Sequence, residues 1–209
     1  MTQAAARYPD ETRAVLSVGG NDILTHPLPV HYDGWRQDVL DIDPATGAAI
    51  ICDARDMQTL KPGIYDAIYC SHNLEHYFAH DVGRVLKGFL HVLKPDGFVE
   101  IWVPDLKAVM REVLKRDLAM DDVLYTTGKD APILVSDVIY GWGAQIAQSG
   151  VDFYAHKTGF CRASLERAIC AAGFAANYPV LRGTDLEIGI LAFPQMPNAQ
   201  RLRQFGIGS

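Results

Sequence analysis

Two acidic residues, Asp41 and Asp53, each follow a short apolar run in the sequence. In a sheet of parallel strands, an acid at the end of a strand is the usual partner of a ribose hydroxyl. Two such acids on neighbouring strands predict a nucleoside pocket, with one carboxylate near the ribose and the other near the base. Gly19 and Gly20 follow another apolar run and form the expected turn of such a pocket. The pattern favours an enzyme that uses a nucleoside cofactor.

Three histidines, His72, His76 and His156, supply a second set of side chains that could do chemistry. A histidine with a pKa near neutrality is the natural base for a substrate hydroxyl that must lose its proton. His156 is the strongest candidate on the substrate side, because it opens a segment that returns from an insertion. A structural role for any one of the three is equally compatible with the sequence.

The segment from His72 to His76 also has the H-x-x-E-H pattern of inverted zinc peptidases. That chemistry requires the interior of a long helix, where both histidines share a face and the glutamate activates water. Here His72 directly follows a strongly strand-like run, and a new helix is predicted to begin just after Phe78. We therefore expect a junction between a strand and a helix, and no bound metal.

The elements that must position these residues are short strands alternating with helices. Runs rich in β-branched and aromatic residues predict strands over 14–18, 38–42, 48–52, 65–71, 98–103, 177–181 and 186–193. Helical spacing of apolar residues predicts helices over 81–93, 106–118 and 162–172, and a helical stretch over 130–149 that is broken at two glycines. Residues 94–97 predict a turn. Pro27 and Pro29 exclude a long helix between the first two strands.

This alternation predicts a Rossmann-like, doubly wound α/β fold whose seven-stranded sheet is mostly parallel and ends in a C-terminal antiparallel hairpin. We expect one domain over residues 14–194 with a helical insertion at about 106–155, between flexible tails at 1–13 and 195–209. Ligands of such folds bind at the carboxyl ends of the strands. Ser17, Asp41, Asp53, Ser71 and His72 all fall at those ends.

Composition narrows the class of partner and the compartment. The net charge is −6 and no run of lysine or arginine is present, which argues against nucleic acid as a partner. The four cysteines form no Cys-x-x-Cys pair, which indicates a reducing compartment. No apolar run approaches the ~20 residues that span a bilayer, and residues 1–11 lack the apolar core of a signal peptide. We expect a cytoplasmic protein that acts on a small molecule.

Six segments carry a more specific pattern. They are VLSVGG at 15–20, VLDIDP at 39–44, CDARDM at 52–57, YDAIYCSHNLEH at 65–76, VLKPDGFVEIWVPD at 92–105 and HKTGFCRASLERAICAAGF at 156–174. In this order they resemble the class I S-adenosylmethionine-dependent methyltransferases, most of all the small methyltransferases of the type 11 kind. The segments cover most of residues 14–193, and their combination is specific although each piece alone is weak.

The resemblance implies S-adenosyl-L-methionine as the cofactor and suggests how the first turn would serve it. Gly19 and Gly20 would let the backbone approach the methionine part of the cofactor. The chain departs from the family at two positions of this motif, where Ser17 replaces an acid and Asn21 replaces a glycine. The first replacement removes one anchor for the amino group of the cofactor.

The resemblance also implies roles at the next two strand ends. Asp41, together with the adjacent Ile42, would hold the ribose hydroxyls. Asp53 would accept a hydrogen bond from the adenine amino group, and Ala54 would supply a backbone amide.

Ser71 and His72 would line the floor beneath the sulfonium, again by resemblance. His72 and His156 are the catalytic candidates. Methyl transfer can also proceed mainly by proximity and in-line alignment, so a base is not obligatory.

The activity implied is methyl transfer to oxygen or nitrogen of a small acceptor, with a saccharide as the preferred class. Tyr140 to Trp142 suit a lid or a wall for sugar stacking, although packing against the core or against a partner chain in a homodimer explains them equally. A non-catalytic protein that binds a nucleoside or a partner on the same fold is the alternative. A nicotinamide dinucleotide binder is disfavoured, because no Gly-x-Gly-x-x-Gly follows the first strand.

Overall fold

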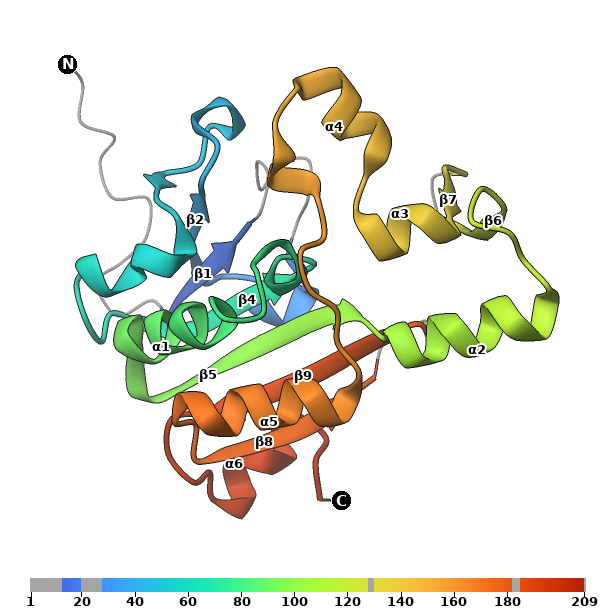
Figure 1. Cartoon of the computed structure of the whole chain (residues 1–209). Helices are drawn as coiled ribbons and strands as arrows, with labels where there is room; N and C mark the ends of the chain where they lie inside the picture. Colours follow the sequence, from blue (N-terminus) through green and yellow to red (C-terminus); the bar gives the residue numbers. More distant parts are fainter. Residues whose placement is uncertain (1–12, 20–27, 128–129, 182–184, 209) are drawn as a thin grey trace.

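A seven-stranded sheet of order β3-β2-β1-β4-β5-β9-β8 forms the centre of the molecule (Figure 1). We describe it from a computed structural model, which covers residues 13–19, 28–127, 130–181 and 185–208. The strands are β1 Ala14–Val18, β2 Arg36–Asp41, β3 Ile50–Ile51, β4 Tyr65–Ser71, β5 Leu93–Pro104, β8 Ala176–Val180 and β9 Glu187–Phe193. β1 to β5 pair in parallel, and β9 runs antiparallel to both of its neighbours. The predicted fold is confirmed.

One face of the sheet is covered by helices α1 (Val82–Val92) and α5 (Arg162–Ala172), which lie side by side (Figure 1). The buried residues of α1 recur at the helical spacing that the sequence predicted, and with those of α5 they complete the main core. β1 is buried along its whole length, as expected of a strand covered on both faces. Gly173 ends α5 in the left-handed conformation that its sequence position predicted.

A smaller core covers the opposite face of the sheet. Tyr32, from the 3-10 helix η1 (Val30–Tyr32), packs there with Phe98 and Phe193. The C-terminal segment contributes helix α6 (Ala199–Arg203) and the side chains of Leu202 and Phe205. The structure therefore differs from the tail expected over 195–209. The reason is apolar burial, because these side chains cover the aromatic rings of β5 and β9.

Between β5 and α5 the chain forms an extension that we call the insertion arm. It contains α2 (Leu106–Arg116), β6 (Val123–Thr126), β7 (Pro132–Leu134), α3 (Val135–Tyr140), α4 (Gly143–Ser149) and the 3-10 helix η5 (Asp152–Tyr154) (Figure 1). The sequence predicted a helical stretch from residue 130, and its start is wrong. Residues 132–134 instead pair with β6, and Asp137 accepts the backbone N–H of Leu134 (3.0 Å) where α3 begins.

Some predicted features are displaced or lie outside the described residues. Residues 94–97 are an irregular start of β5 and not a separate turn, because the β4 partner shifts there from Leu93 to Phe98. The described part of the first crossover contains η1 and no longer helix, in agreement with its prolines. The tail at 1–12 and the turn around Gly183 lie outside the described residues. No helix in the described part of the chain has the length and apolar character needed to cross a membrane.

Candidate functional site

The parallel strands β1, β2, β4 and β5 end on one side of the sheet, which we call the carboxyl edge. Gly19 follows β1, Asp41 ends β2, and Ser71 ends β4. Backbone hydrogen bonds fix these ends, from Gly19 N–H to Leu40 and from His72 N–H to Trp102, each at 2.9 Å. The structure therefore brings the predicted acids, glycine turn and histidine to the same edge. Gly20 lies outside the described residues.

Asp41 keeps acceptor capacity for a ligand. Its carboxylate accepts the backbone N–H of Asp43 at 2.8 Å, and no other described side chain bonds to it. Burial raises the pKa of Asp41, and the nearby charge of Asp43 adds to the rise. Ile42 continues the backbone past it, and its amide partly offsets this shift. A half-buried carboxylate with free lone pairs can accept from a ribose diol.

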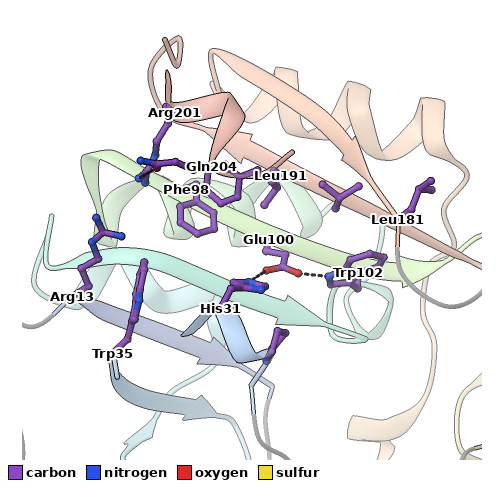
Figure 2. Close-up of a pocket in the computed structure, with 13 residues that line it drawn as sticks. Arg13, His31, Trp35, Phe98, Glu100, Trp102, Leu181, Leu191, Arg201 and Gln204 are labelled. Carbon is purple, nitrogen blue, oxygen red and sulfur yellow. Dashed lines mark hydrogen bonds and ion pairs between the residues drawn. The ribbon is translucent and has the colours of Figure 1, made fainter. Parts of the chain in front are cut away.

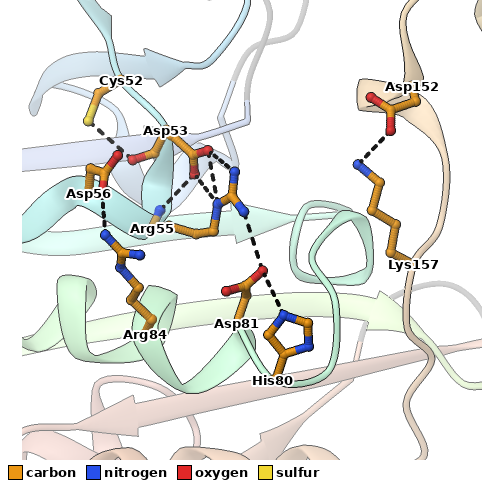
Figure 3. Close-up of polar contacts among 9 residues, drawn as sticks. All are labelled: Cys52, Asp53, Arg55, Asp56, His80, Asp81, Arg84, Asp152 and Lys157. Atoms are coloured by element: carbon orange, nitrogen blue, oxygen red, sulfur yellow. Dashed lines mark hydrogen bonds and ion pairs between the residues drawn. The ribbon is translucent and has the colours of Figure 1, made fainter.

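Asp53 is engaged differently. Its two oxygens accept four contacts from Arg55, namely the backbone N–H (2.9 Å), Nε (3.1 and 3.0 Å) and Nη2 (2.6 Å) (Figure 3). Burial tends to raise the pKa of Asp53, but the hydrogen bonds and charge of Arg55 outweigh it and the pKa is lowered. Arg55 also reaches Asp81 at 3.3 Å. Since a carboxylate offers about four lone-pair sites, none is left over here.

This geometry makes Asp53 the cap of the 3-10 helix η3 (Ala54–Thr59), with Ala54 buried at its start. The contact predicted between Asp53 and an adenine amino group stays a prediction, and it requires Arg55 to release part of the carboxylate. This ion pair could not be predicted from the sequence, because an Asp-x-Arg spacing is compatible with a free acid as well as with an ion pair.

The turn after β1 is covered by a side chain that the sequence analysis did not single out. Gly19 has a φ of 71°, and a Cβ at this position would overlap the side chain of Asn73. The Oδ1 atom of Asn73 is buried and accepts no hydrogen bond from the described residues. An orphaned buried acceptor costs stability, so it marks a place where a ligand could donate.

His72 is held between two glutamates. Its φ of 51° is unusual for a residue with a side chain. Nε2 lies 2.8 Å from Glu187 Oε1, and Nδ1 lies 3.3 Å from Glu75 Oε1. Burial works against the charged ring, but both glutamates outweigh it and raise the pKa of His72 to about 9. His72 is therefore an imidazolium at neutral pH, which fits a donor better than the predicted base.

His156 and His76 form a neighbouring pair with ring centroids 4.9 Å apart. The Nδ1 atom of His156 lies 2.9 Å from the carbonyl of Val138, and that of His76 lies 3.1 Å from the carbonyl of Ala155. A carbonyl only accepts, so each Nδ1 carries the proton and each Nε2 keeps a lone pair. Burial lowers the pKa of His156, which favours the neutral ring.

A cavity lies elsewhere, on the sheet face opposite α1. It encloses about 650 Å³ and is lined by aromatic rings, two arginines and Glu100 (Figure 2). Glu100 accepts from Tyr32 Oη (2.9 Å) and Trp102 Nε1 (2.7 Å), and it pairs with His31 at 2.9 Å. None of the residues predicted for cofactor binding or catalysis lines this cavity. Its polar groups satisfy one another, so we place the functional site at the carboxyl edge.

Comparison with known proteins shows which family and which solved structures the chain resembles. The family described as "Methyltransferase domain", type 11, matches residues 34–101, a stretch that includes β2, β4 and most of β5. The match covers about a third of the chain and marks that stretch as similar to this family. The resemblance predicted from the sequence is thereby confirmed. No curated protein matches the sequence.

Solved structures resemble most of the chain at low identity. The PH0226 protein from Pyrococcus horikoshii OT3 has 15% identity and a TM-score of 0.57, over 90% of this chain and 84% of its own. A SAM dependent methyltransferase from Archaeoglobus fulgidus has 13% identity and a TM-score of 0.52, over 87% of this chain and 86% of its own. An O-methyltransferase family protein from Burkholderia thailandensis has 14% identity and a TM-score of 0.51, over 88% of this chain and 51% of its own. At these identities the likeness establishes the fold.

Proposed function

We propose that this protein transfers the methyl group of S-adenosyl-L-methionine to oxygen or nitrogen of a small acceptor. The observation that carries the proposal is Asp41, a half-buried carboxylate at the end of β2 with lone pairs to spare. It lies inside the segment that matches the methyltransferase domain. The fold neighbours that are named as SAM dependent and O-methyltransferases also support methyl transfer as the activity.

The residues present fit the cofactor. Asp41 would accept from the ribose hydroxyls, beside the backbone of Ile42. The buried Oδ1 of Asn73 would accept from the amino group of the methionine part, over the turn at Gly19. Asn73 would thus stand in for the acid that Ser17 replaces. When bound, the cofactor supplies an electrophilic methyl group, and Ser71 would line the floor below it.

The acceptor side would be formed by the insertion arm. Nε2 of His156 is a neutral acceptor that could take the proton of an acceptor hydroxyl or amine. Tyr140 and Trp142, next to the same segment, are 64% and 55% exposed. Exposed aromatic rings are suited to stacking on a sugar, which supports a saccharide as the acceptor class.

Calorimetric titration with S-adenosylhomocysteine tests the cofactor site through a matched pair of variants. Asp41→Asn removes a charged acceptor, and we expect affinity to fall roughly 10- to 100-fold. Asp43→Asn is the control, because its side chain caps the next turn through the N–H of Ala45 (2.8 Å) and asparagine caps equally well. Absence of binding by the unaltered protein, or equal losses in both variants, would overturn the proposal.

One observation favours the alternative of a non-catalytic nucleoside binder. The side chain of Asn73 fills the space over Gly19, where the methionine part would lie. Binding of S-adenosylhomocysteine without turnover on a panel of saccharide and phenolic acceptors would support this second function. Turnover of any of them would exclude it.

A further inference from the structure

Three side chains meet beside the carboxyl edge in a way that neither a methyltransferase fold nor its cofactor requires. Glu75 and His76, from the 3-10 helix η4 (Leu74–His76), and His156 each offer one ligand atom, and these atoms lie within 4.8 Å of one another. We infer that they bind a divalent transition-metal ion, with Zn²⁺ as the best match.

Glu75 carries the strongest part of this inference. It is 1% exposed, and neither carboxylate oxygen accepts a hydrogen bond from the described residues. Its one charged neighbour at close range is His72, whose Nδ1 lies at 3.3 Å without the alignment of a hydrogen bond. Burying a carboxylate is costly unless it is hydrogen-bonded or coordinates a metal. A cation among the three side chains would supply the missing partner.

The two histidines are already oriented as metal ligands are. A metal-bound histidine almost always donates its other ring N–H to a carbonyl or carboxylate, which fixes the ring and its tautomer. His76 donates from Nδ1 to Ala155, and His156 donates from Nδ1 to Val138. Each Nε2 lone pair is therefore available for coordination, and both rings are half-buried.

Backbone hydrogen bonds hold the segment that carries His156 against Glu75 and His76. The carbonyl of Glu75 accepts the N–H groups of Lys157 and Thr158 at 2.7 and 3.1 Å. We call residues 155–158, which carry His156, the strap. His156 N–H also donates to Tyr140 at 2.9 Å, so the strap is tied to the insertion arm on its other side. The ligands therefore come from two segments that are fixed to each other.

The donor set indicates which ion fits. Two imidazoles and one carboxylate suit Zn²⁺, whereas Mg²⁺ prefers oxygen ligands and retained water. In a tetrahedral zinc shell, ligand atoms lie about 3.3 Å apart, so small side-chain rotations would close the site. Three protein ligands leave a fourth position for water or for an acceptor oxygen, which the metal would polarise. With the ion bound, Nε2 of His156 would be a ligand and could not also take the acceptor proton, so the base proposed above applies to the metal-free protein.

This site differs from the peptidase pattern that His72 to His76 suggested, and the inference departs from the expectation of no metal. His72 is not a ligand here, because Glu187 and Glu75 occupy its two nitrogens. Its place is taken by His156, 80 residues further along the chain than His76. His72 would instead orient the carboxylate of Glu75, because its Nδ1 lies 3.3 Å from Oε1.

The test is titration of chelator-treated, tag-free protein with Zn²⁺, and separately with Mg²⁺, in the absence of any cofactor. We expect one Zn²⁺ per chain and much weaker binding of Mg²⁺. Glu75→Gln, His76→Gln and His156→Gln should each weaken Zn²⁺ binding by roughly 100-fold or more, beyond the 10- to 100-fold typical of outer-shell changes. His91→Gln is the matched control, since His91 is a half-buried histidine that contacts Leu60 far from the cluster.

Two further measurements keep the test decisive. Circular dichroism of each variant shows that weak binding is not a failure to fold. Co²⁺ in place of Zn²⁺ reports the ligands by absorption, and a thiolate band would assign the ion to one of the free cysteines. Such a band, no bound Zn²⁺, or equal affinity in the cluster variants and the control would each overturn the inference. Because no cofactor is present, these outcomes are independent of the proposed methyl transfer.

Discussion

Glu75 and Glu100 are both buried, at 1% and 5% exposure, yet their surroundings are opposite. Glu100, on the sheet face that carries the cavity, receives a hydrogen bond from Trp102 and pairs with His31 (Figure 2). It also receives a hydrogen bond from Tyr32. Glu75, at the carboxyl edge, receives none from the described residues. A satisfied buried acid holds structure together, whereas an unsatisfied one costs stability and points to a ligand. The comparison therefore separates a buried acid that is structural from one that we propose to bind a ligand.

The largest effect on stability should come from removing Glu100, the acid whose hydrogen bonds are satisfied. Glu100→Ala leaves the Tyr32 hydroxyl and the Trp102 indole N–H without their acceptor, so we expect the free energy of unfolding to fall by about 3 kcal/mol. Urea denaturation measures this loss. Glu100→Gln retains one acceptor oxygen and should lose less. Equal stability of Glu100→Ala and the unaltered protein would refute a structural role for this cluster.

The next effect concerns the other unpartnered acceptor of the carboxyl edge. Asn73→Ala removes the buried Oδ1 of the side chain that covers Gly19, and we expect affinity for S-adenosylhomocysteine to fall about tenfold, the effect of one hydrogen bond. Calorimetric titration measures the change. Tighter binding by Asn73→Ala would show that Asn73 blocks the turn, and would favour the non-catalytic alternative.

A smaller effect on stability is expected from the matching substitution of Glu75, and it compares the two buried acids directly. Glu75→Gln removes a buried carboxylate that accepts no hydrogen bond from the described residues but lies 3.3 Å from the His72 imidazolium, which keeps Glu187 as a partner, so in metal-free protein the free energy of unfolding should fall by about 1 kcal/mol. Urea denaturation in the presence of a chelator measures it, alongside Glu100→Gln. A loss from Glu75→Gln as large as that from Glu100→Ala would mean that Glu75 is structural after all.

The smallest effect is a pH dependence at Asp53. Arg55 lowers the pKa of this carboxyl, so their pairing stabilises the fold above the unfolded pKa of about 3.9 and is lost as the pH falls through the lower folded value. Arg55→Gln should therefore cost under about 1 kcal/mol at pH 7 and nothing near pH 2. Arg84→Gln is the control, because it breaks the exposed pair with Asp56 and should change little at either pH.

The parts of the fold that could be predicted are those with strong local signals. β1, β4 and α5 have the predicted boundaries, because long apolar runs and a terminal glycine fix them locally. The β6–β7 hairpin was missed because its strands are short and half exposed, with Val123 at 42% and Tyr125 at 41%. Helix α6 was missed because contacts with β5 and β9, and not its own five residues, hold it in place.

The candidate site also has parts that could be predicted from local sequence signals and parts that could not. The acids at the strand ends could be read from the sequence, because strand ends are visible in it. The saturation of Asp53 by Arg55 depends on a side-chain conformation that spacing does not fix. The burial of Glu75 and its approach to His156 depend on the strap, which arrives from a distant part of the chain. Chemistry that depends on such long-range contacts is not visible in a local motif.

The two hydrogen bonds from the strap to the carbonyl of Glu75 have a mechanical consequence. They close a loop of about 80 residues that contains α1, β5 and the whole insertion arm. Loop-closure entropy grows only slowly with length, so a clasp this small can hold a loop this large. Losing the clasp would leave the arm tied to the sheet by its covalent link to β5 and by the hydrogen bond from Leu106 N–H to the carbonyl of Phe160 (2.9 Å). A single proteolytic cut within the strap would therefore loosen the arm without releasing it, because α2 still joins the arm to β5.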